Sequence, residues 1–224
     1  MSGMNTLLAD LAQLVRRTCA LWDAGWVTFN WRAYTYDHVQ RVRGLALTLG
    51  RREGCDEHVI ELAALLHDVT KPYDGEYLTD EQGRRIVDER GYWRSKTRPP
   101  RRHGEVTRLY ERLELAGSLH NESGGIVARH LLRSRGVDEP TCASVAQAIQ
   151  EHLRPPNDAG IESRCLYDAD TIDANIGLPA FVRNIHINQH FYDLRRPPET
   201  PTLAVVLADD PLAFLRPYVH QKLP

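Results

Sequence analysis

The chain has 224 residues, of which 42% are hydrophobic, and its formal net charge at pH 7 is -2. This length and apolar content suffice for one sizeable core, so we expect a single domain over residues 1–224. A nearly neutral chain has no global charge field that would attract nucleic acid or a membrane surface. We therefore expect neither partner, while the composition leaves a homo-oligomer open.

Four cysteines are scattered along the chain without a CxxC pair: Cys19, Cys55, Cys142 and Cys165. This spacing is typical of reduced, mostly buried thiols and argues against a disulfide framework or a zinc ribbon. The first ten residues lack the charged-then-apolar pattern of a signal peptide. No apolar run reaches the roughly 18 residues that a membrane span needs. The sequence thus predicts a cytoplasmic protein.

Apolar residues recur at helical spacing through most of the chain. The predicted helices occupy residues 6–22, 37–51, 57–69, a stretch beginning near 105, 121–135, 138–153, 163–174 and 178–192. Asp37, Asp56 and Asp138 stand where N-caps are favoured. The aromatic-rich stretch 22–36 is predicted to be a loop packed against the core. The proline-rich tail from Pro197 is predicted to wrap the surface.

The stretch 73–103 interrupts the helical pattern, and its weak alternation around two glycines favours a β-hairpin or a loop. Within it, residues 84–102 hold eight basic and two acidic side chains. Such an excess of positive charge could cover a site and attract an anionic substrate. Arg94, Lys96 and Arg98 are the candidate substrate-binding residues of this segment.

The strongest chemical signal is a histidine followed directly by an aspartate, His67-Asp68, at the end of an apolar helix. Burying a carboxylate without a partner is very costly, so Asp68 needs a cation or strong hydrogen-bond donors. A metal ion supplies that charge. Imidazole nitrogen and carboxylate oxygen are ordinary ligands for Mn, Fe, Co, Ni or Zn. We interpret the pair as part of a metal site.

Other side chains share this placement on the apolar faces or at the ends of predicted helices. His38 leads one apolar stripe, His152 ends another, and His120 opens a third helix. Asp170 belongs to an acidic run on an otherwise apolar helix. Several such groups that converge are what a metal site inside a helical bundle requires.

The order of His38, His67-Asp68 and a distant Asp170 resembles the HD-domain superfamily of metal-dependent phosphohydrolases. The segment AALLHDVTK, residues 63–71, is similar to the motif that defines the family. Two later segments, residues 147–152 and 167–173, are similar to its later motifs. The resemblance covers about residues 36–177. It implies an all-α helical bundle with a central metal site. The sequence pattern adds to this core an insertion at about 73–103, and a C-terminal helix and tail over 178–224.

Members of the family with two additional histidines can bind two metals instead of one. By resemblance, the first metal would be held by His38, His67, Asp68 and Asp170. The second would be held by Asp68, His120 and His152, with Asp68 bridging the two ions.

The assignment of His120 has two nearby rivals. His130 follows ten residues later, which turns it about 80° away from the inward face of a helix. His103 lies in the basic, irregular segment. We therefore prefer His120 as the ligand.

The family implies hydrolysis of a small phosphorylated substrate, namely a phosphomonoester, a nucleotide or a phosphodiester, by a metal-activated water. Asp68 would hold the attacking group, and Lys71 would neutralise charge on the phosphoryl oxygens. Two alternatives stay open. Some dinuclear HD proteins resemble the inositol oxygenase group, which cleaves C–C or C–P bonds at a di-iron centre. A non-catalytic HD module would instead bind a nucleotide and regulate a partner.

Overall fold

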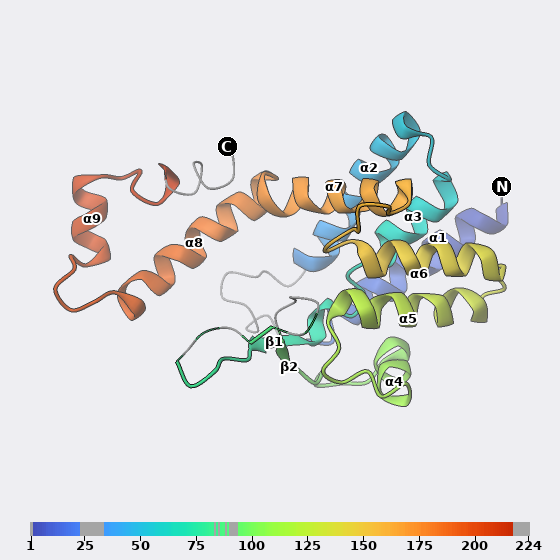
Figure 1. Cartoon of the computed structure of the whole chain (residues 1–224), viewed down its shortest axis with the longest axis horizontal. Coiled ribbons are helices and arrows are strands. Elements are labelled where there is room, and N and C mark those ends of the chain that lie inside the picture. The colour runs from blue at the N-terminus through green and yellow to red at the C-terminus, as the bar shows by residue number, and fades with distance from the viewer. Residues whose placement is uncertain are drawn as a thin grey trace.

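The computed structural model describes residues 2–22, 34–82, 84, 86, 87, 89 and 94–216. This part of the chain contains nine α-helices and one two-stranded sheet (Figure 1), so the predicted all-α fold with a small hairpin is confirmed. The helices are α1 (Ser2–Cys19), α2 (Tyr34–Glu53), α3 (Glu57–Leu66), α4 (Glu105–Arg112), α5 (His120–Ser134), α6 (Glu139–Glu151), α7 (Ile161–Asn175), α8 (Leu178–Arg195) and α9 (Leu203–Asp209). A short 3-10 helix, η1 (Lys71–Tyr73), leads into strand β1 (Asp74–Tyr77), which pairs antiparallel with β2 (Ser95–Thr97).

Helix α3 is the centre of the bundle and packs against α1, α2, α6 and α7. From Leu62 to its end the side chains are all apolar, as expected of a helix segment that is covered all round. Every residue from Leu62 to Leu66 is 0% exposed. Three of the four cysteines are buried as well, and all four are free thiols, as predicted. The C-terminal end of α3 therefore lies in the buried interior of the bundle.

The start of α3 is predicted correctly, but its end is not. The Asp56 carboxylate caps the helix by accepting hydrogen bonds from the backbone N–H groups of His58 and Val59, at 2.8 and 3.2 Å. The helix ends at Leu66 instead of Val69. From there the backbone changes to tighter turns, because the N–H of Val69 bonds the carbonyl three residues before it. This change places His67 and Asp68 in a buried turn beyond the helix.

The second helix begins earlier than predicted, at Tyr34. Asp37 is therefore not its N-cap but lies in its first turn, where a carboxylate still interacts favourably with the helix dipole. The aromatic-rich loop predicted over 22–36 falls mostly on residues 23–33, which lie outside the described residues. Trp22 at its start is buried and donates a hydrogen bond from Nε1 to the carbonyl of Arg98, at 3.0 Å. This bond ties the end of α1 to the insertion.

Helices α5 and α6 pack closely as an antiparallel pair (Figure 1). A Cβ at Gly125 would lie only 2.8 Å from the carbonyl oxygen of Ala146, so a larger residue there would force the pair apart. Asp138 caps α6, as predicted, by accepting a hydrogen bond from the N–H of Thr141 at 3.0 Å. The close pairing brings the first residue of α5 and the last turn of α6 to the same end of the bundle.

The C-terminal segment leads away from the bundle. Helix α8 continues outward from α7, and α9 lies near its far end (Figure 1). The Tyr192 hydroxyl donates to the carbonyl of Pro201 at 3.1 Å, and the Tyr192 ring meets Phe214 edge to face at 5.3 Å. The tail from Pro197, which is predicted to wrap the surface, lies against the end of α8 as far as the described residues extend. The tail folds back on α8, because the aromatic and polar groups at the end of that helix provide its partners.

Candidate metal centre

The His67-Asp68 pair lies in the turn that follows α3, inside the bundle. His67 is 0% exposed and Asp68 is 2% exposed. The turn is anchored from α5: Thr70 Oγ1 donates to the carbonyl of His120 at 3.0 Å and lies 2.8 Å from Ser123 Oγ. A buried carboxylate in such a place requires compensating positive charge.

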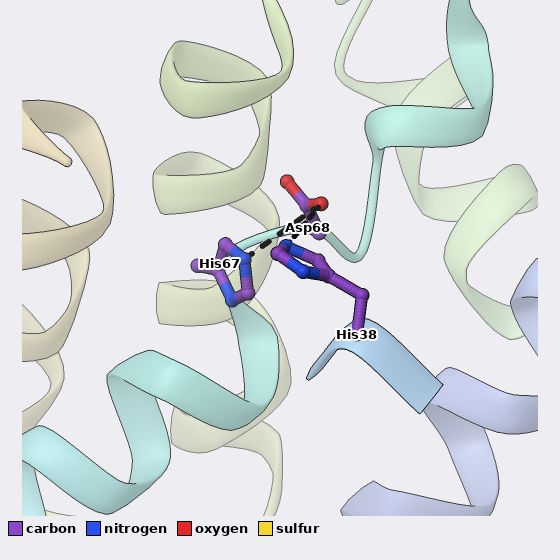
Figure 2. A group of neighbouring side chains, drawn as sticks. All are labelled: His38, His67 and Asp68. Atoms are coloured by element: carbon purple, nitrogen blue, oxygen red, sulfur yellow. Dashed lines mark ion pairs between the residues drawn. The ribbon is translucent and has the colours of Figure 1, made fainter. Parts of the chain in front are cut away.

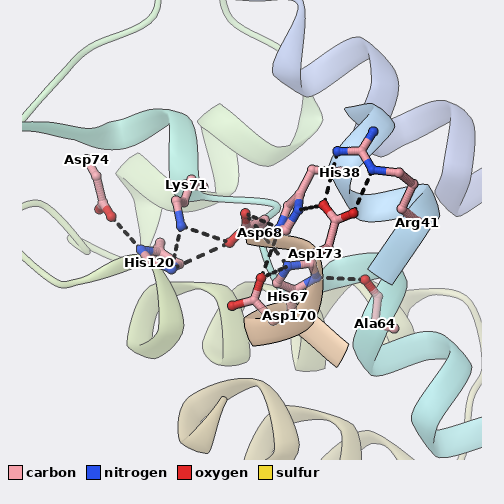
Figure 3. A network of polar contacts seen from close by, with 10 residues as sticks. All are labelled: His38, Arg41, Ala64, His67, Asp68, Lys71, Asp74, His120, Asp170 and Asp173. Carbon is pink, nitrogen blue, oxygen red and sulfur yellow. Dashed lines mark hydrogen bonds and ion pairs between the residues drawn. The ribbon is translucent and has the colours of Figure 1, made fainter. Parts of the chain in front are cut away.

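Four helices bring further histidines and aspartates to this turn. His38 comes from the first turns of α2, His120 is the first residue of α5, His152 caps the end of α6, and Asp170 lies on α7. Figure 2 shows His38 and His67 beside Asp68, and Figure 3 shows the wider network. The predicted residues are thus brought together from segments far apart in the sequence.

The side chains form two groups whose potential ligand atoms all lie within 4.8 Å of one another. The first group is His38, His67 and Asp68, and the second is Asp68, His120 and His152. Asp170 adjoins the first group, with Oδ1 at 3.0 Å from His38 Nε2 and 3.8 Å from His67 Nε2. Asp68 belongs to both groups, which is the placement expected of a bridging carboxylate.

Each of the four histidines is oriented through Nδ1. His67 Nδ1 donates to the carbonyl of Ala64 at 2.8 Å, and His152 Nδ1 donates to that of Ile149 at 2.6 Å. Carbonyl oxygens only accept, so Nδ1 carries the proton and Nε2 of the neutral ring keeps its lone pair. This leaves Nε2 of both rings available to bind a cation in the interior.

Carboxylates orient the other two rings by accepting a hydrogen bond from Nδ1. His38 Nδ1 donates to Asp173 Oδ2 at 2.7 Å, and His120 Nδ1 donates to the carboxylate of Asp74. Arg41 holds Asp173 in turn through two hydrogen bonds of 2.7 and 3.0 Å (Figure 3). A histidine whose outer nitrogen is bound to a carbonyl or carboxylate is the usual arrangement around a protein-bound metal.

Several buried polar atoms in the centre have no hydrogen-bond partner. They include His67 Nε2, His152 Nε2 and Asp68 Oδ1. Unpaired polar atoms in a dry interior are costly, and natural proteins rarely leave them unsatisfied. Two imidazole lone pairs and a carboxylate oxygen that face one another fit the ligand preferences of a divalent transition metal. The residues present therefore fit the metal ions that the sequence predicts.

The charges of the centre are strongly perturbed. Burial disfavours the charged form of His38, but its hydrogen bonds to Asp170 and Asp173 outweigh burial and raise the pKa of His38 to about 9. Burial would raise the pKa of Asp68, yet Lys71 and the surrounding histidines hold it well below its usual range. The carboxylate of Asp68 is thus fully ionised at neutral pH and is ready to bind a cation.

The two deepest histidines stay neutral. Burial lowers the pKa of His67, and burial together with the neighbouring His67 and His120 lowers the pKa of His152 to about 3. A neutral imidazole is the form that coordinates a metal. No proton therefore has to leave the Nε2 atoms of His67 and His152 before an ion binds.

Lys71 lies at the edge of the centre. Its Nζ is 3.6 Å from Asp68 Oδ1 and 3.3 Å from His120 Nε2 (Figure 3). Its side chain is 35% exposed, so the amine meets both the buried carboxylate and the solvent. Lys71 can therefore meet an anion that approaches the metal ligands.

The basic segment is placed differently. Arg94 and Lys96 are exposed on the insertion, and within the described residues neither side chain forms a hydrogen bond or an ion pair with the centre. Arg98 is only partly exposed, and its backbone bonds Tyr73 and Trp22. Their role in binding substrate remains a prediction.

The rivals of His120 lie elsewhere. His103 is 54% exposed and pairs with Glu111 at 3.1 Å, and His130 is exposed on the outer side of α5. Sequence reasoning missed Asp74 and Asp173 as the residues that orient histidines. For Asp173 a signal existed, because it follows Asp170 by three residues and so shares its side of α7. Asp168, on the same helix, is exposed to solvent.

The chain belongs to the HD domain family, whose family model matches residues 35–175. This match includes all the residues of both histidine–aspartate groups. Among curated proteins, no significant match to this sequence is found. Within the described residues, no helix is both long and apolar enough to cross a membrane.

The chain is also similar to several solved structures of low sequence identity. A predicted HD superfamily hydrolase from an uncultured Thermotogales bacterium is 22% identical, with a TM-score of 0.50 over 95% of this chain and 91% of that one. YpgQ of Bacillus subtilis in complex with ADP is 18% identical, with a TM-score of 0.42 over 96% of this chain and 94% of that one. A protein from Lactobacillus plantarum is 15% identical, with a TM-score of 0.44 over 93% and 84%.

Proposed function

We propose that the chain is a metal-dependent phosphohydrolase that acts on a phosphate ester through a dinuclear centre. The observation that carries this proposal is the pair of ligand groups that share Asp68, with the amine of Lys71 beside the shared carboxylate. Membership in the HD domain family supports the same class of reaction.

The first ion would be held by His38, His67, Asp68 and Asp170, and the second by Asp68, His120 and His152. Divalent ions in such a centre lower the pKa of coordinated water and neutralise charge on phosphoryl oxygens. The protein holds the rings in place through the carbonyls and carboxylates that bind each Nδ1. The ligands are thus organised before any substrate arrives.

Lys71 would act on the substrate directly. Its ammonium is a strong donor, and its partial exposure lets it reach a phosphoryl oxygen without leaving Asp68. Charge on those oxygens changes during phosphoryl transfer, so a fixed cation beside them lowers the barrier. We further propose that Arg94, Lys96 and Arg98 attract the anionic substrate from the insertion.

Hydrolysis of p-nitrophenyl phosphate and bis-p-nitrophenyl phosphate by the metal-loaded protein tests this proposal. Lys71→Gln should lower kcat by about 100-fold, the usual effect of removing a group that stabilises transition-state charge. Arg164→Gln, which removes an exposed charge from α7, serves as the control and should leave kcat unchanged.

Oxygen consumption by the reduced, iron-loaded protein separates the two enzymatic alternatives. If oxygen is consumed with a candidate substrate while neither phosphate ester is hydrolysed, the protein is an oxygenase and the proposal is wrong. If the metal-loaded protein binds nucleotides but turns over none of these compounds, the regulatory alternative replaces it.

A further inference from the structure

Arg183 is a partly buried arginine on α8 and lies outside the ligand set of the metal centre. Its Nε is enclosed and has no hydrogen-bond partner. Among the described residues, its Nη1 reaches the Asn184 side chain next to it, at 3.3 Å. Within the described residues no carboxylate lies within ion-pairing distance of the guanidinium. A desolvated cation with no acidic partner is uncommon, because burial of charge is costly unless the charge is paired.

A stack of rings joins Arg183 to the centre. The Arg183 guanidinium lies over the Tyr34 ring at 4.9 Å, and that ring is stacked parallel to His38 with 6.5 Å between centroids. The cation–π contact fixes the plane of the guanidinium. Burial lowers the pKa of Arg183, and the neighbouring Tyr34 offsets part of this effect. The group remains a cation, held in place by an aromatic ring instead of by an acid.

The cations around the centre are distributed unequally. Lys71 stands at the His120 end, where it meets Asp68 and His120 (Figure 3). At the His38 end, Arg41 is bound by both oxygens of Asp173 and has its charge neutralised. Arg183 is linked to this same end through Tyr34, and the residues that the structure describes offer it no such neutralising partner. Among them, Arg183 is therefore the cation at this end whose donors are left for an external anion.

We propose that Arg183, held against Tyr34, binds a second phosphate group of the substrate. The Tyr34 ring separates Arg183 from the nearest candidate ligand in this stack, His38. This inference rests on the proposed phosphohydrolase function and narrows its substrate class to molecules that carry two phosphate groups. The reacting phosphate would lie at the metal ligands and Lys71, and the second would meet the Arg183 guanidinium. A planar guanidinium suits this part, because it can donate two parallel hydrogen bonds to one phosphate.

Calorimetric titration of the metal-loaded protein with two non-hydrolysable anions tests the inference. Methylphosphonate carries one phosphonate group, and methylenediphosphonate carries two. Arg183→Gln should weaken binding of methylenediphosphonate by about tenfold, as expected for the loss of one charge-assisted contact, and leave methylphosphonate unchanged. Arg183→Lys should restore part of the loss, and Arg164→Gln should cause none. Circular dichroism and metal content, measured after each titration, verify that every variant stays folded and loaded.

Three results would overturn the inference, each in its own way. If Arg183→Gln binds both anions as the wild type does, Arg183 does not recognise substrate. If it loses affinity equally for both, Arg183 binds the reacting phosphate and not a second one. If the wild type binds neither anion, the phosphate-ester function itself fails, and this inference fails with it.

Discussion

At the scale of single residues, the centre depends on how each histidine is oriented. The carboxylates of Asp173 and Asp74 and the carbonyls of Ala64 and Ile149 each bind one Nδ1. These outer contacts select the tautomer and direct Nε2 inward. Replacing residues in such positions typically lowers metal affinity by about 10- to 100-fold.

The second metal should depend on His120 and His152. Metal analysis of the saturated wild type should give two ions per chain, and His120→Ala or His152→Ala should each give one. The reason is that both rings belong to the group that includes Asp68 but not His38. His130→Ala, an exposed histidine of the same helix as His120, should keep two. Unchanged occupancy in the His120 variant would contradict the assignment, and one ion in the wild type would reduce the centre to a mononuclear site.

Metal affinity should rise with pH up to about 9. In the metal-free protein the pKa of His38 is raised to about 9, above the 6.5 of an unperturbed histidine, so the ring is protonated at neutral pH. The Nε2 proton, which lies towards Asp170, must leave before an ion can bind there. Apparent affinity should therefore fall about tenfold for each pH unit below 9 while this proton is displaced.

Calorimetry in buffers of different ionisation enthalpy measures the protons released on metal binding. We expect about one proton from His38 at pH 7.5 and only about a quarter of a proton at pH 9.5. Replacement of the exposed His58 by alanine is the control and should leave this release unchanged. An affinity for metal that is constant between pH 7 and 9 would show that His38 is not a ligand.

At the scale of elements, the centre lies where helix ends meet. His120 opens α5, His152 closes α6, and His67 follows the last residue of α3. A residue at a helix end can be fixed by the packing of that helix while its side chain stays free to face a neighbour. Gly124 supports this arrangement, since a Cβ there would meet the carbonyl oxygen of His67 at 3.1 Å.

The insertion is the element whose role is easiest to isolate. Replacing Arg94, Lys96 and Arg98 by glutamine in one triple variant should raise KM for a phosphorylated substrate about tenfold and leave kcat nearly intact. The salt dependence of kcat/KM should also become flatter, because attraction between exposed charges is screened beyond about 8 Å at physiological ionic strength. Steady-state kinetics over a range of salt concentrations measures both effects.

A second triple variant controls for net charge. Arg17, Arg52 and Arg164 are exposed arginines on three helices, and their replacement by glutamine removes the same number of charges. This variant should keep the wild-type KM and salt slope. If the insertion variant does so as well, the basic segment is a solvated loop, and anion recognition rests on Lys71 and the metals.

At the scale of the whole molecule, the helical bundle could be predicted because each helix is indicated by local signals, namely apolar spacing and N-cap residues. Asp56 and Asp138 cap helices as their positions indicate. The His67-Asp68 pair could be found because its members are adjacent and follow an apolar run. The end of α3 could not be predicted, because the turn beyond it is fixed by Thr70 contacts with α5.

Other features needed tertiary information. Asp74 lies on a strand of the insertion, and its contact with His120 arises only when that strand packs beside α5. The fold of the C-terminal segment back on α8 likewise depends on contacts such as that of Tyr192 with Phe214. Sequence spacing has no means of anticipating either pairing.

The central claim is that the interior of the bundle holds metal ions through Asp68. Metal analysis of the purified wild type and of Asp68→Ala tests it most directly, with Asp168→Ala on the exposed side of α7 as the control. We predict about two divalent ions per chain in the wild type and the control, and almost none in Asp68→Ala, with the same helical circular dichroism in all three. A wild type without metal after saturation, or an Asp68→Ala protein that retains both ions, would contradict the account.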